Sequence, residues 1–192
     1  VKLAGALSAI HAVGIIHRDV KPENVILAAE DEPRLTDFGL AKDLDSESHL
    51  SKTGQFMGTP GYWPPEQASG KLDRIGPSSD VYSLGATLYA LLTGVAPLLA
   101  GSLLECMAIT CGKPAEAPSV ANAAVPAELD RIVLKCLEKQ TEDRYPDAAA
   151  LRRELEGFLA ADRGGPLGSR SRAPLFAALA LGVLAVGVAA VS

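Results

Sequence analysis

The sequence of 192 residues has few cysteines, few histidines and no excess of positive charge. Its three cysteines, Cys106, Cys111 and Cys136, form no Cys-x-x-Cys motif and share no metal-ligand spacing with the three histidines. We therefore interpret them as buried free thiols in a reducing compartment. The net charge of −5 argues against a nucleic-acid-binding surface, so we expect no nucleic-acid partner.

The composition is not that of a disordered protein, and the chain does not begin with a secretory signal. Disorder is excluded except locally because 48% of the residues are hydrophobic and 21% are charged. The length allows one domain with a full core and an appendage. The chain opens inside an amphipathic pattern without a secretory signal or an initiator Met, so we expect a fragment of a longer protein.

The most informative stretch is residues 17–24, HRDVKPEN, which contain a carboxylate, an ammonium and a carboxamide close together. A short apolar run with β-branched residues follows at residues 25–28 and has the pattern of a buried strand. A charged loop that leads into a buried strand is costly unless it binds something charged. The stretch therefore predicts a binding site for a charged group.

A second polar motif, RLTDFG at residues 34–39, indicates what that group is. If residues 25–28 and 34–36 are antiparallel strands joined by a turn at residues 29–33, Asn24 and Asp37 meet at the same end of the hairpin. Their amide and carboxylate oxygens suit a Mg²⁺ ion that also carries nucleotide phosphates.

Two neighbouring side chains complete the chemistry of this site. Lys21 would neutralise a phosphoryl oxygen, and Asp19 would accept the proton of an attacking hydroxyl. The alternative is a polar loop beside a hairpin whose charges are merely solvated. The joint presence, order and placement of the two motifs favour the first interpretation.

The motifs His-Arg-Asp-x-Lys-Pro-x-Asn and Asp-Phe-Gly resemble the catalytic loop and the metal-binding loop of protein kinases. The resemblance covers Val1 to about Ala160 and matches the C-terminal lobe of bacterial Hanks-type Ser/Thr protein kinases. It implies a mainly α fold with a small β-hairpin, a kinase-like C-terminal lobe at residues 1–161. It also implies ATP and Mg²⁺ as cofactors, and transfer of the γ-phosphoryl group to Ser/Thr hydroxyls of protein substrates.

The resemblance assigns a role to each matching residue. Asp19 is the catalytic base, Lys21 contacts phosphate, and Asn24 and Asp37 bind Mg²⁺. Residues expected to support the site structurally are His17, Arg18, Glu66, Asp80 and Arg144.

Three of the supporting residues have specific expected contacts. Arg144 pairs with Glu66, or is a solvated side chain on a loop between helices. Asp80 supports the catalytic loop from beneath, caps its own helix, or does both.

Residues 40–65 show little periodicity, and a segment of this length is usually functional or disordered. By resemblance it is the activation segment, which ends at residues 58–66, GTPGYWPPE, with Pro64 where Ala is usual. Thr59 is then on a substrate-facing loop, and together with Lys21 it matches the Ser/Thr pattern rather than the Tyr pattern. The alternative for Thr59 is an ordinary turn hydroxyl.

Activation by phosphorylation is expected in the same segment. Thr53 is the first candidate and Ser51 the second. A phosphate on either residue could make a bidentate contact with Arg18 and order the loop. The alternative is that both are ordinary loop hydroxyls in contact with solvent.

Apolar spacing predicts the helices. The first has Leu3, Leu7 and Ile10 on one face and ends at Gly14. His11 lies beside that face and is interpreted as a packed or surface imidazole rather than a ligand.

Residues 80–94 are apolar almost all round and predict a buried helix. Ser102 and Glu105 predict a capping box at the start of another helix. Two further apolar faces are Leu129, Ile132, Val133, Cys136 and Leu137, and Leu151, Leu155, Phe158 and Leu159 with Asp147 as cap.

Two parts of the kinase pattern are absent from the sequence. No Gly-x-Gly-x-x-Gly loop precedes the catalytic loop, and no strand lysine with its helix glutamate is present. We therefore expect the N-terminal lobe to be missing and these residues alone to be inactive. The alternative function is a catalytically inactive kinase-like binding module tethered to a membrane.

The last part of the chain differs in composition. Residues 162–173 contain three Arg, three Gly, one Pro and two Ser, which predicts a flexible basic linker. Residues 174–191 are uncharged and, at about 1.5 Å per residue, just cross a ~30 Å hydrocarbon core. We expect a single transmembrane helix in the cell inner membrane or plasma membrane, the alternative being a buried core helix. The kinase lobe would then be cytoplasmic, with homodimers for autophosphorylation.

Overall fold

The computed structural model describes residues 1–38, 42–43 and 59–164. The predicted phosphorylation sites Thr53 and Ser51, and the predicted membrane span at 174–191, lie outside these residues. The elements are α1 Lys2–His11, β1 Ile15–Ile16, η1 Pro22–Asn24, β2 Val25–Ala28, η2 Ala29–Asp31, β3 Glu32–Leu35, β4 Lys42–Asp43, α2 Pro65–Ala68, η4 Leu72–Arg74, α3 Pro77–Thr93, α4 Leu103–Gly112, α5 Pro118–Ala121, α6 Ala127–Cys136, η5 Thr141–Asp143 and α7 Ala148–Gly164.

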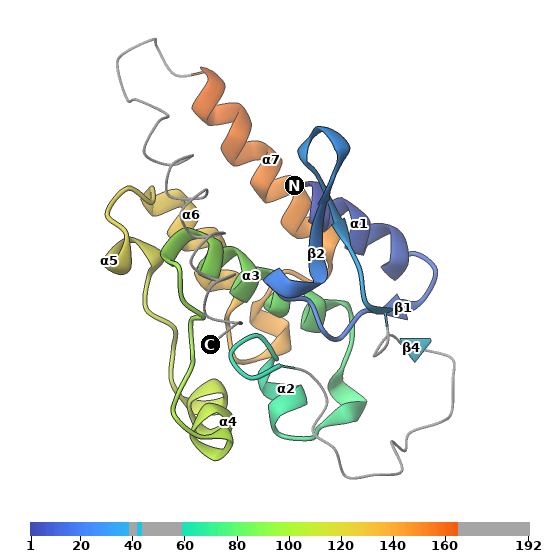
Figure 1. Cartoon of the computed structure of the whole chain (residues 1–192), viewed down its shortest axis with the longest axis vertical. Helices are drawn as coiled ribbons and strands as arrows, with labels where there is room; N and C mark the ends of the chain where they lie inside the picture. Colours follow the sequence, from blue (N-terminus) through green and yellow to red (C-terminus); the bar gives the residue numbers. More distant parts are fainter. Residues whose placement is uncertain (39–41, 44–58, 165–192) are drawn as a thin grey trace.

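The buried helix α3 is the centre of the helical part, with α1, α6 and α7 packed around it (Figure 1). It ends before Gly94, which adopts a left-handed conformation with φ 83°, as the predicted end at residue 94 requires. It begins at Pro77 rather than at Asp80, because Gly76 is the N-cap and the Ser79 hydroxyl accepts a hydrogen bond from the Gly76 N–H. Asp80 is therefore not the cap, and its carboxylate is available to other groups.

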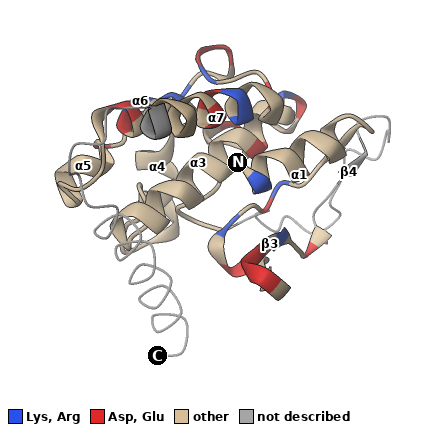
Figure 2. Ribbon diagram, turned by 90° about the horizontal axis from the view of Figure 1, so that it is seen from above, with Lys and Arg blue, Asp and Glu red and all other residues tan. Residues whose placement is uncertain are grey.

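The distribution of charged side chains agrees with the central position of α3. In Figure 2 most of α3 is free of charged side chains, whereas Lys, Arg, Asp and Glu lie mainly on the outer parts of the molecule. The shared core consists of residues from α1, α3, α6, α7 and the segments between them. Its largest fully buried members include Tyr82, Leu7, Ile132 and Leu151. The helical faces predicted from the sequence therefore meet at α3.

The predicted hairpin is present as β2 and β3, paired antiparallel with Val25 opposite Leu35. The expectation that its first strand is buried is wrong, because β2 pairs only with β3 and its residues Ile26 and Leu27 are 50% and 61% exposed. The second strand begins at Glu32 instead of residue 34 and ends at Leu35 instead of 36. The reason is that Glu30 and Asp31 have positive φ angles of 60° and 55°, so the chain reverses in fewer residues than predicted. A second two-stranded sheet, β1 with β4, was not predicted.

The ends of the other helices match the predicted caps in part. Ser102 caps α4 by accepting a hydrogen bond from Glu105 N, and Asp147 accepts one from Ala150 N in α7. The helix α1 stops at His11 rather than at Gly14; Gly14, with φ 77°, donates its N–H to the His11 carbonyl just after the helix. The helix α7 continues to Gly164, three residues into the range predicted as a linker.

The predicted apolar faces pack against the core, although Leu3 and Ile10 of α1 are only partly buried. Every residue predicted on the apolar face of α6 is buried, which confirms that face. On α7, Leu151 and Leu155 are buried and Phe158 packs partly against the core, but Leu159 is 41% exposed and lies at its edge. The last helix therefore buries a shorter stripe than its sequence pattern predicts.

The three cysteines are free thiols, but only Cys106 and Cys136 are buried. Burial raises the pKa of the Cys136 thiol to about 12, so this side chain stays protonated. The expectation of burial is wrong for Cys111, which is exposed near the end of α4. None of the helices within the described ranges is long and apolar enough to span a membrane.

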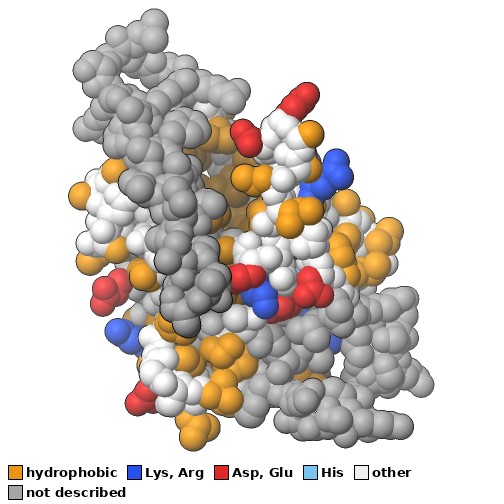
Figure 3. Space-filling model, in the orientation of Figure 1, with side chains coloured by type: hydrophobic (Ala, Val, Ile, Leu, Met, Phe, Trp, Pro, Cys, Tyr) orange, Lys and Arg blue, Asp and Glu red, His pale blue; other side chains and the backbone are white. Residues whose placement is uncertain are grey.

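The surface around α4 is rich in apolar side chains. Figure 3 shows orange side chains gathered over the lower part of the molecule, where α4 lies. Leu99, Leu103 and Leu104 are 62%, 41% and 75% exposed. This face is a feature of the outer surface and contributes little to the core.

Candidate active site

The loop 17–24 is attached to α3 through Asp80. The Asp80 side chain is fully buried, and its carboxylate accepts hydrogen bonds from the backbone N–H groups of His17 and Arg18, each at 2.8 Å. Arg18 has φ 69°, a conformation that costs a non-glycine residue of order 1 kcal/mol and persists only where its surroundings hold it. Gln67 of α2 holds the other side of this residue by donating to the Arg18 carbonyl at 3.1 Å.

His17 connects the loop to the second polar motif. Its Nε2 lies 3.1 Å from the Thr36 carbonyl, and its Nδ1 accepts the Asp19 N–H at 3.4 Å. These contacts require the tautomer with the proton on Nε2. The imidazole also lies against the Phe38 ring, with centroids 4.7 Å apart, so one fully buried side chain orders both motifs.

Asp19, Lys21 and Thr59 form a compact polar cluster. The Lys21 ammonium lies 2.9 Å from Asp19 Oδ2 and donates to Thr59 Oγ1 at 2.7 Å, while the Thr59 hydroxyl donates to Asp19 Oδ1 at 3.1 Å. The structure thus brings the predicted base, the predicted phosphate contact and the predicted substrate-facing hydroxyl together. An aliphatic hydroxyl already lies against the carboxylate at hydrogen-bond distance.

Asn24 lies directly behind this cluster. Its Nδ2 donates to the Asp19 carbonyl at 2.8 Å and to Asp19 Oδ2 at 3.1 Å, which directs its Oδ1 away from Asp19. The Asn24 carbonyl accepts the N–H of Thr36 at 2.8 Å and its hydroxyl at 3.1 Å. Asp37 follows Thr36, so the two predicted metal ligands lie at the same end of the hairpin.

The donor set fits a Mg²⁺ ion that arrives with a nucleotide. Mg²⁺ prefers oxygen ligands and usually takes one or two carboxylates from the protein, with phosphates and waters completing its shell. Asn24 and Asp37 can supply two such oxygens. Within the described ranges, no three His, Cys, Asp or Glu side chains are grouped as a metal cage, so phosphates would have to complete the coordination.

The predicted pair of Glu66 and Arg144 is present and buried. Two hydrogen bonds of 2.8 Å join the Arg144 guanidinium to the Glu66 carboxylate. The Arg144 side chain is 0% exposed and the Glu66 side chain 3%. Glu66 also accepts from Ser79 Oγ at 2.7 Å, and Arg144 donates to backbone carbonyls of Ser78, Glu138 and Lys139. The alternative of a solvated Arg144 is wrong, and the pair fixes α2 against α3 and the segment before α7.

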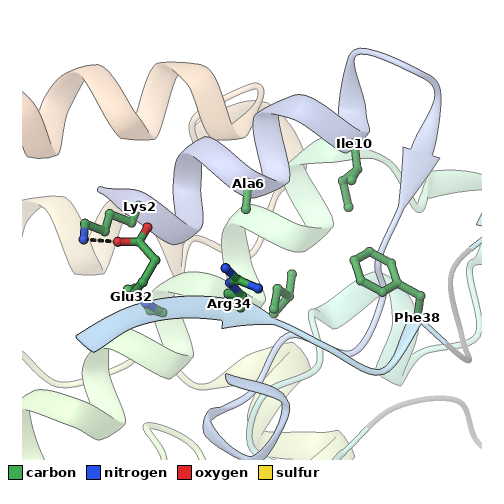
Figure 4. A pocket seen from close by; sticks show the side chains of 8 residues that line it. Lys2, Ala6, Ile10, Glu32, Arg34 and Phe38 are labelled. Carbon is green, nitrogen blue, oxygen red and sulfur yellow. Dashed lines mark hydrogen bonds and ion pairs between the residues drawn. The ribbon is translucent and has the colours of Figure 1, made fainter. Parts of the chain in front are cut away.

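A groove of about 440 Å³ runs between α1 and β3 (Figure 4). An ion pair between Lys2 and Glu32 closes one end, and Phe38 points into the other end. The groove lining does not include Asp19, so this hollow is separate from the catalytic cluster.

Sequence reasoning missed several residues that hold the site. Gln67, Ser79 and Thr36 bond to the loop or to Glu66. His11 is packed, as one of its two interpretations predicts, but its contact with Asp80 was not predicted. Their partners are distant in sequence, and no local spacing marks them. The position of Thr36 directly before Asp37 is the one usable signal, since the hairpin register places it opposite Asn24.

Comparison with known proteins gives consistent matches. The protein kinase domain family matches residues 1–155. The chain is 43% identical over 153 residues to the probable serine/threonine-protein kinase PkwA of Thermomonospora curvata, and 40% identical over 151 residues to the serine/threonine-protein kinase PknB of Mycobacterium tuberculosis. These alignments cover 80% and 78% of this chain, but the chain spans only 19% and 24% of those two relatives.

Proposed function

The chain belongs to the protein kinase family, and we propose that it forms the catalytic lobe of a serine/threonine protein kinase. The reaction is transfer of the γ-phosphoryl group of ATP to Ser/Thr hydroxyls of proteins. One observation carries this proposal: the Thr59 hydroxyl lies 3.1 Å from Asp19 Oδ1 and 2.7 Å from the Lys21 ammonium. A substrate hydroxyl held in that position would have a base and a cation within reach.

Each residue of the cluster has a defined task in this reaction. Asp19 accepts the proton that leaves the attacking hydroxyl, and Asn24 keeps the Asp19 carboxylate oriented through its Nδ2. Lys21 neutralises charge on the transferred group. ATP with Mg²⁺ supplies the phosphoryl group, and Asn24 Oδ1 and Asp37 would hold the metal.

The comparisons and two residues of the site support Ser/Thr rather than Tyr as the acceptor. PkwA and PknB, which are similar to this chain, are named as serine/threonine-protein kinases. Lys21 and Thr59, the residues that match the Ser/Thr pattern, bond to each other beside the Asp19 carboxylate. We therefore expect phosphoserine and phosphothreonine as the products.

The test uses the longest natural protein that contains these residues, incubated with Mg²⁺ and labelled ATP. Asp37→Ala should abolish Mg²⁺-dependent ATP binding, whereas Asp31→Asn, on the exposed turn between β2 and β3, should leave it unchanged. Phosphoamino acid analysis should give phosphoserine or phosphothreonine. Unchanged ATP binding by Asp37→Ala would contradict the metal assignment, and a wild-type protein without transfer would favour the inactive binding module.

We also propose that phosphorylation of Thr53, or of Ser51, activates the enzyme through Arg18. Support comes from the Arg18 side chain, whose Nε is buried and has no hydrogen-bond partner among the described residues. Burial lowers the pKa of this guanidinium, which remains cationic and would gain from an anionic partner. Mass spectrometry of active protein should find the phosphate, and Thr53→Ala with Ser51→Ala should reduce activity; unmodified residues would end this proposal.

A further inference from the structure

The connecting loop between α3 and α4, residues 95–102, lies directly against the backbone of Gly61. Gly61 is buried with φ 90°, and a Cβ placed on it would be 3.0 Å from the Ala96 Cβ and 3.5 Å from Leu99 Cδ1. Contacts this close leave no room for a side chain at residue 61. The connecting loop therefore forms a wall against the short segment that also carries Thr59.

This segment, the substrate-facing turn at residues 59–62, leads directly into the catalytic cluster. The Tyr62 N–H donates to the Thr59 carbonyl at 3.1 Å, which closes the turn around Gly61. The Thr59 hydroxyl donates to Asp19 Oδ1 at 3.1 Å. A movement of the wall behind Gly61 would therefore shift the surface that an acceptor meets beside Asp19.

Cys106 of α4 holds the connecting loop through one atom. Its Sγ accepts the Ala100 N–H at 3.2 Å, and its S–H donates to the Ala100 carbonyl at 3.5 Å. Ala100 lies outside any helix or strand, and its backbone has no other hydrogen-bond partner within the described ranges. The buried thiol thus satisfies both polar backbone groups of a residue that regular structure does not restrain.

The backbone at Ala100 fixes the two leucines before it. Leu98 is 4% exposed, whereas Leu99 is 62% exposed and reaches Gly61. A rotation of the chain at Ala100 would redirect Leu99, the member of the wall that solvent does not hold in place. A thiol is only a weak donor and a weak acceptor, so we expect its loss to act locally and to leave the fold intact.

We propose that Cys106 is a positioning residue for the substrate-facing turn, acting through Ala100 and the connecting loop, and that it tunes the affinity for the protein substrate. Its effect on substrate binding rests on the proposed function, in which the acceptor hydroxyl lies beside Asp19. Its effect on the connecting loop does not depend on that function. Because the Cys106 side chain is buried and bonds to Ala100, it is not assigned a contact with substrate or a step of the reaction.

Two variants separate the hydrogen bonds from packing. Cys106→Ser keeps a donor and an acceptor beside Ala100, whereas Cys106→Val fills the space without either. Amide hydrogen exchange on the 192-residue chain should show that Cys106→Val speeds exchange at Ala100 about threefold to tenfold, as expected for losing a hydrogen bond between neutral groups. Cys106→Ser should remain near wild type.

A second cysteine of α4 provides the matched control. The Cys111 thiol contacts the Pro65 carbonyl at 3.7 Å and not the connecting loop, so Cys111→Val should leave exchange at Ala100 unchanged. The Ser119 N–H, which donates to Asp130 Oδ1 at 2.9 Å, reports on general stability. Equal acceleration at Ser119 and Ala100 in Cys106→Val would show general destabilisation, and no acceleration at Ala100 would show that the loop needs no thiol; either result overturns the proposal.

Kinetics of the longest natural protein, with a Ser/Thr peptide as acceptor, then test the consequence for substrate. Cys106→Val should raise the KM for the peptide about threefold to tenfold while kcat and the KM for ATP stay near wild type, and Cys106→Ser should restore the peptide KM. An unchanged peptide KM despite fast exchange at Ala100, or a lower kcat at an unchanged peptide KM, would refute the link from Cys106 to substrate binding. If no variant, including wild type, transfers phosphate, the proposed function fails while the exchange result still decides whether Cys106 holds the connecting loop.

Discussion

Lys139 is the residue whose burial has the clearest consequence for stability. Its Nζ is buried without a hydrogen-bond partner in the described part of the chain, and its ammonium lies 5.9 Å from the centre of the Tyr82 ring. Burial, with a smaller contribution from the Arg144 charge, lowers the pKa of Lys139 from 10.5 to about 8. The cationic form therefore destabilises the folded protein.

This gives a prediction about pH. Between pH 8 and 10.5 the unfolded chain keeps a proton on Lys139 that the folded chain has lost, so the contribution of Lys139 to stability becomes more favourable as the pH rises through this window. Lys139→Met should remove this pH-dependent contribution and, allowing for the partial exposure of the side chain, add about 1 kcal/mol at pH 7. Urea unfolding at pH 7 and pH 10 measures both effects. Lys71→Met, at an exposed lysine, should change neither, and an unaltered pH slope in Lys139→Met would contradict the account.

Residues of the site differ in how far the sequence could predict them. Asp19, Lys21 and Asn24 were predicted to lie together because all three belong to one short loop, and the structure brings them within hydrogen-bond distance. The contact of His11 with Asp80 was not predicted, because the two residues are 69 positions apart in the sequence. Contacts of this kind depend on how two helices cross, which local spacing does not encode.

The crossing of α3 and α6 depends on one glycine. A Cβ added at Gly85 would lie 2.3 Å from the Cys136 Cβ, closer than two non-bonded carbon atoms can approach. The gain in helix propensity from an alanine, about 1 kcal/mol, is smaller than the cost of separating the two helices. The crossing therefore requires glycine at this position.

We predict that Gly85→Ala destabilises the protein by about 1–3 kcal/mol in urea unfolding, the usual cost of overpacking. Gly112, in the last turn of α4, is the matched control, because a Cβ there would meet nothing within 4 Å. Gly112→Ala should be neutral or stabilising. Wild-type stability of Gly85→Ala would mean that the helices cross with more room than the structure shows.

Among the elements, long amphipathic helices were predictable and short ones were not. The apolar face of α6 follows from its spacing, because a helix in contact with a core buries a continuous stripe. The start of α3 was predicted too late, since the glycine N-cap at Gly76 carries no side-chain signal. The sheet of β1 and β4 pairs only two residues from each strand, too few for a recognisable pattern.

For the whole molecule, the membrane span that the sequence predicts at residues 174–191 leads to a prediction about topology. Arg163, Arg170 and Arg172 precede the apolar residues 174–191, and positive charge of this kind stays on the cytoplasmic side. We propose that the kinase lobe faces the cytoplasm, where ATP is available. Protease added to intact cells should leave the lobe uncut and should digest it after the membrane is opened. Digestion in intact cells would refute this orientation.

The assignment of Asp19 as the base is tested most directly by the rate of phosphoryl transfer to a Ser/Thr peptide. The measurement compares Asp19→Asn with wild type and with Asp31→Asn, all in the longest natural protein that contains the loop. Asp19→Asn should retain ATP binding but lower the rate about 100-fold or more, the contribution of a general base, while Asp31→Asn matches wild type. A near-normal rate in Asp19→Asn would contradict the central claim that this carboxylate takes the proton from the acceptor hydroxyl.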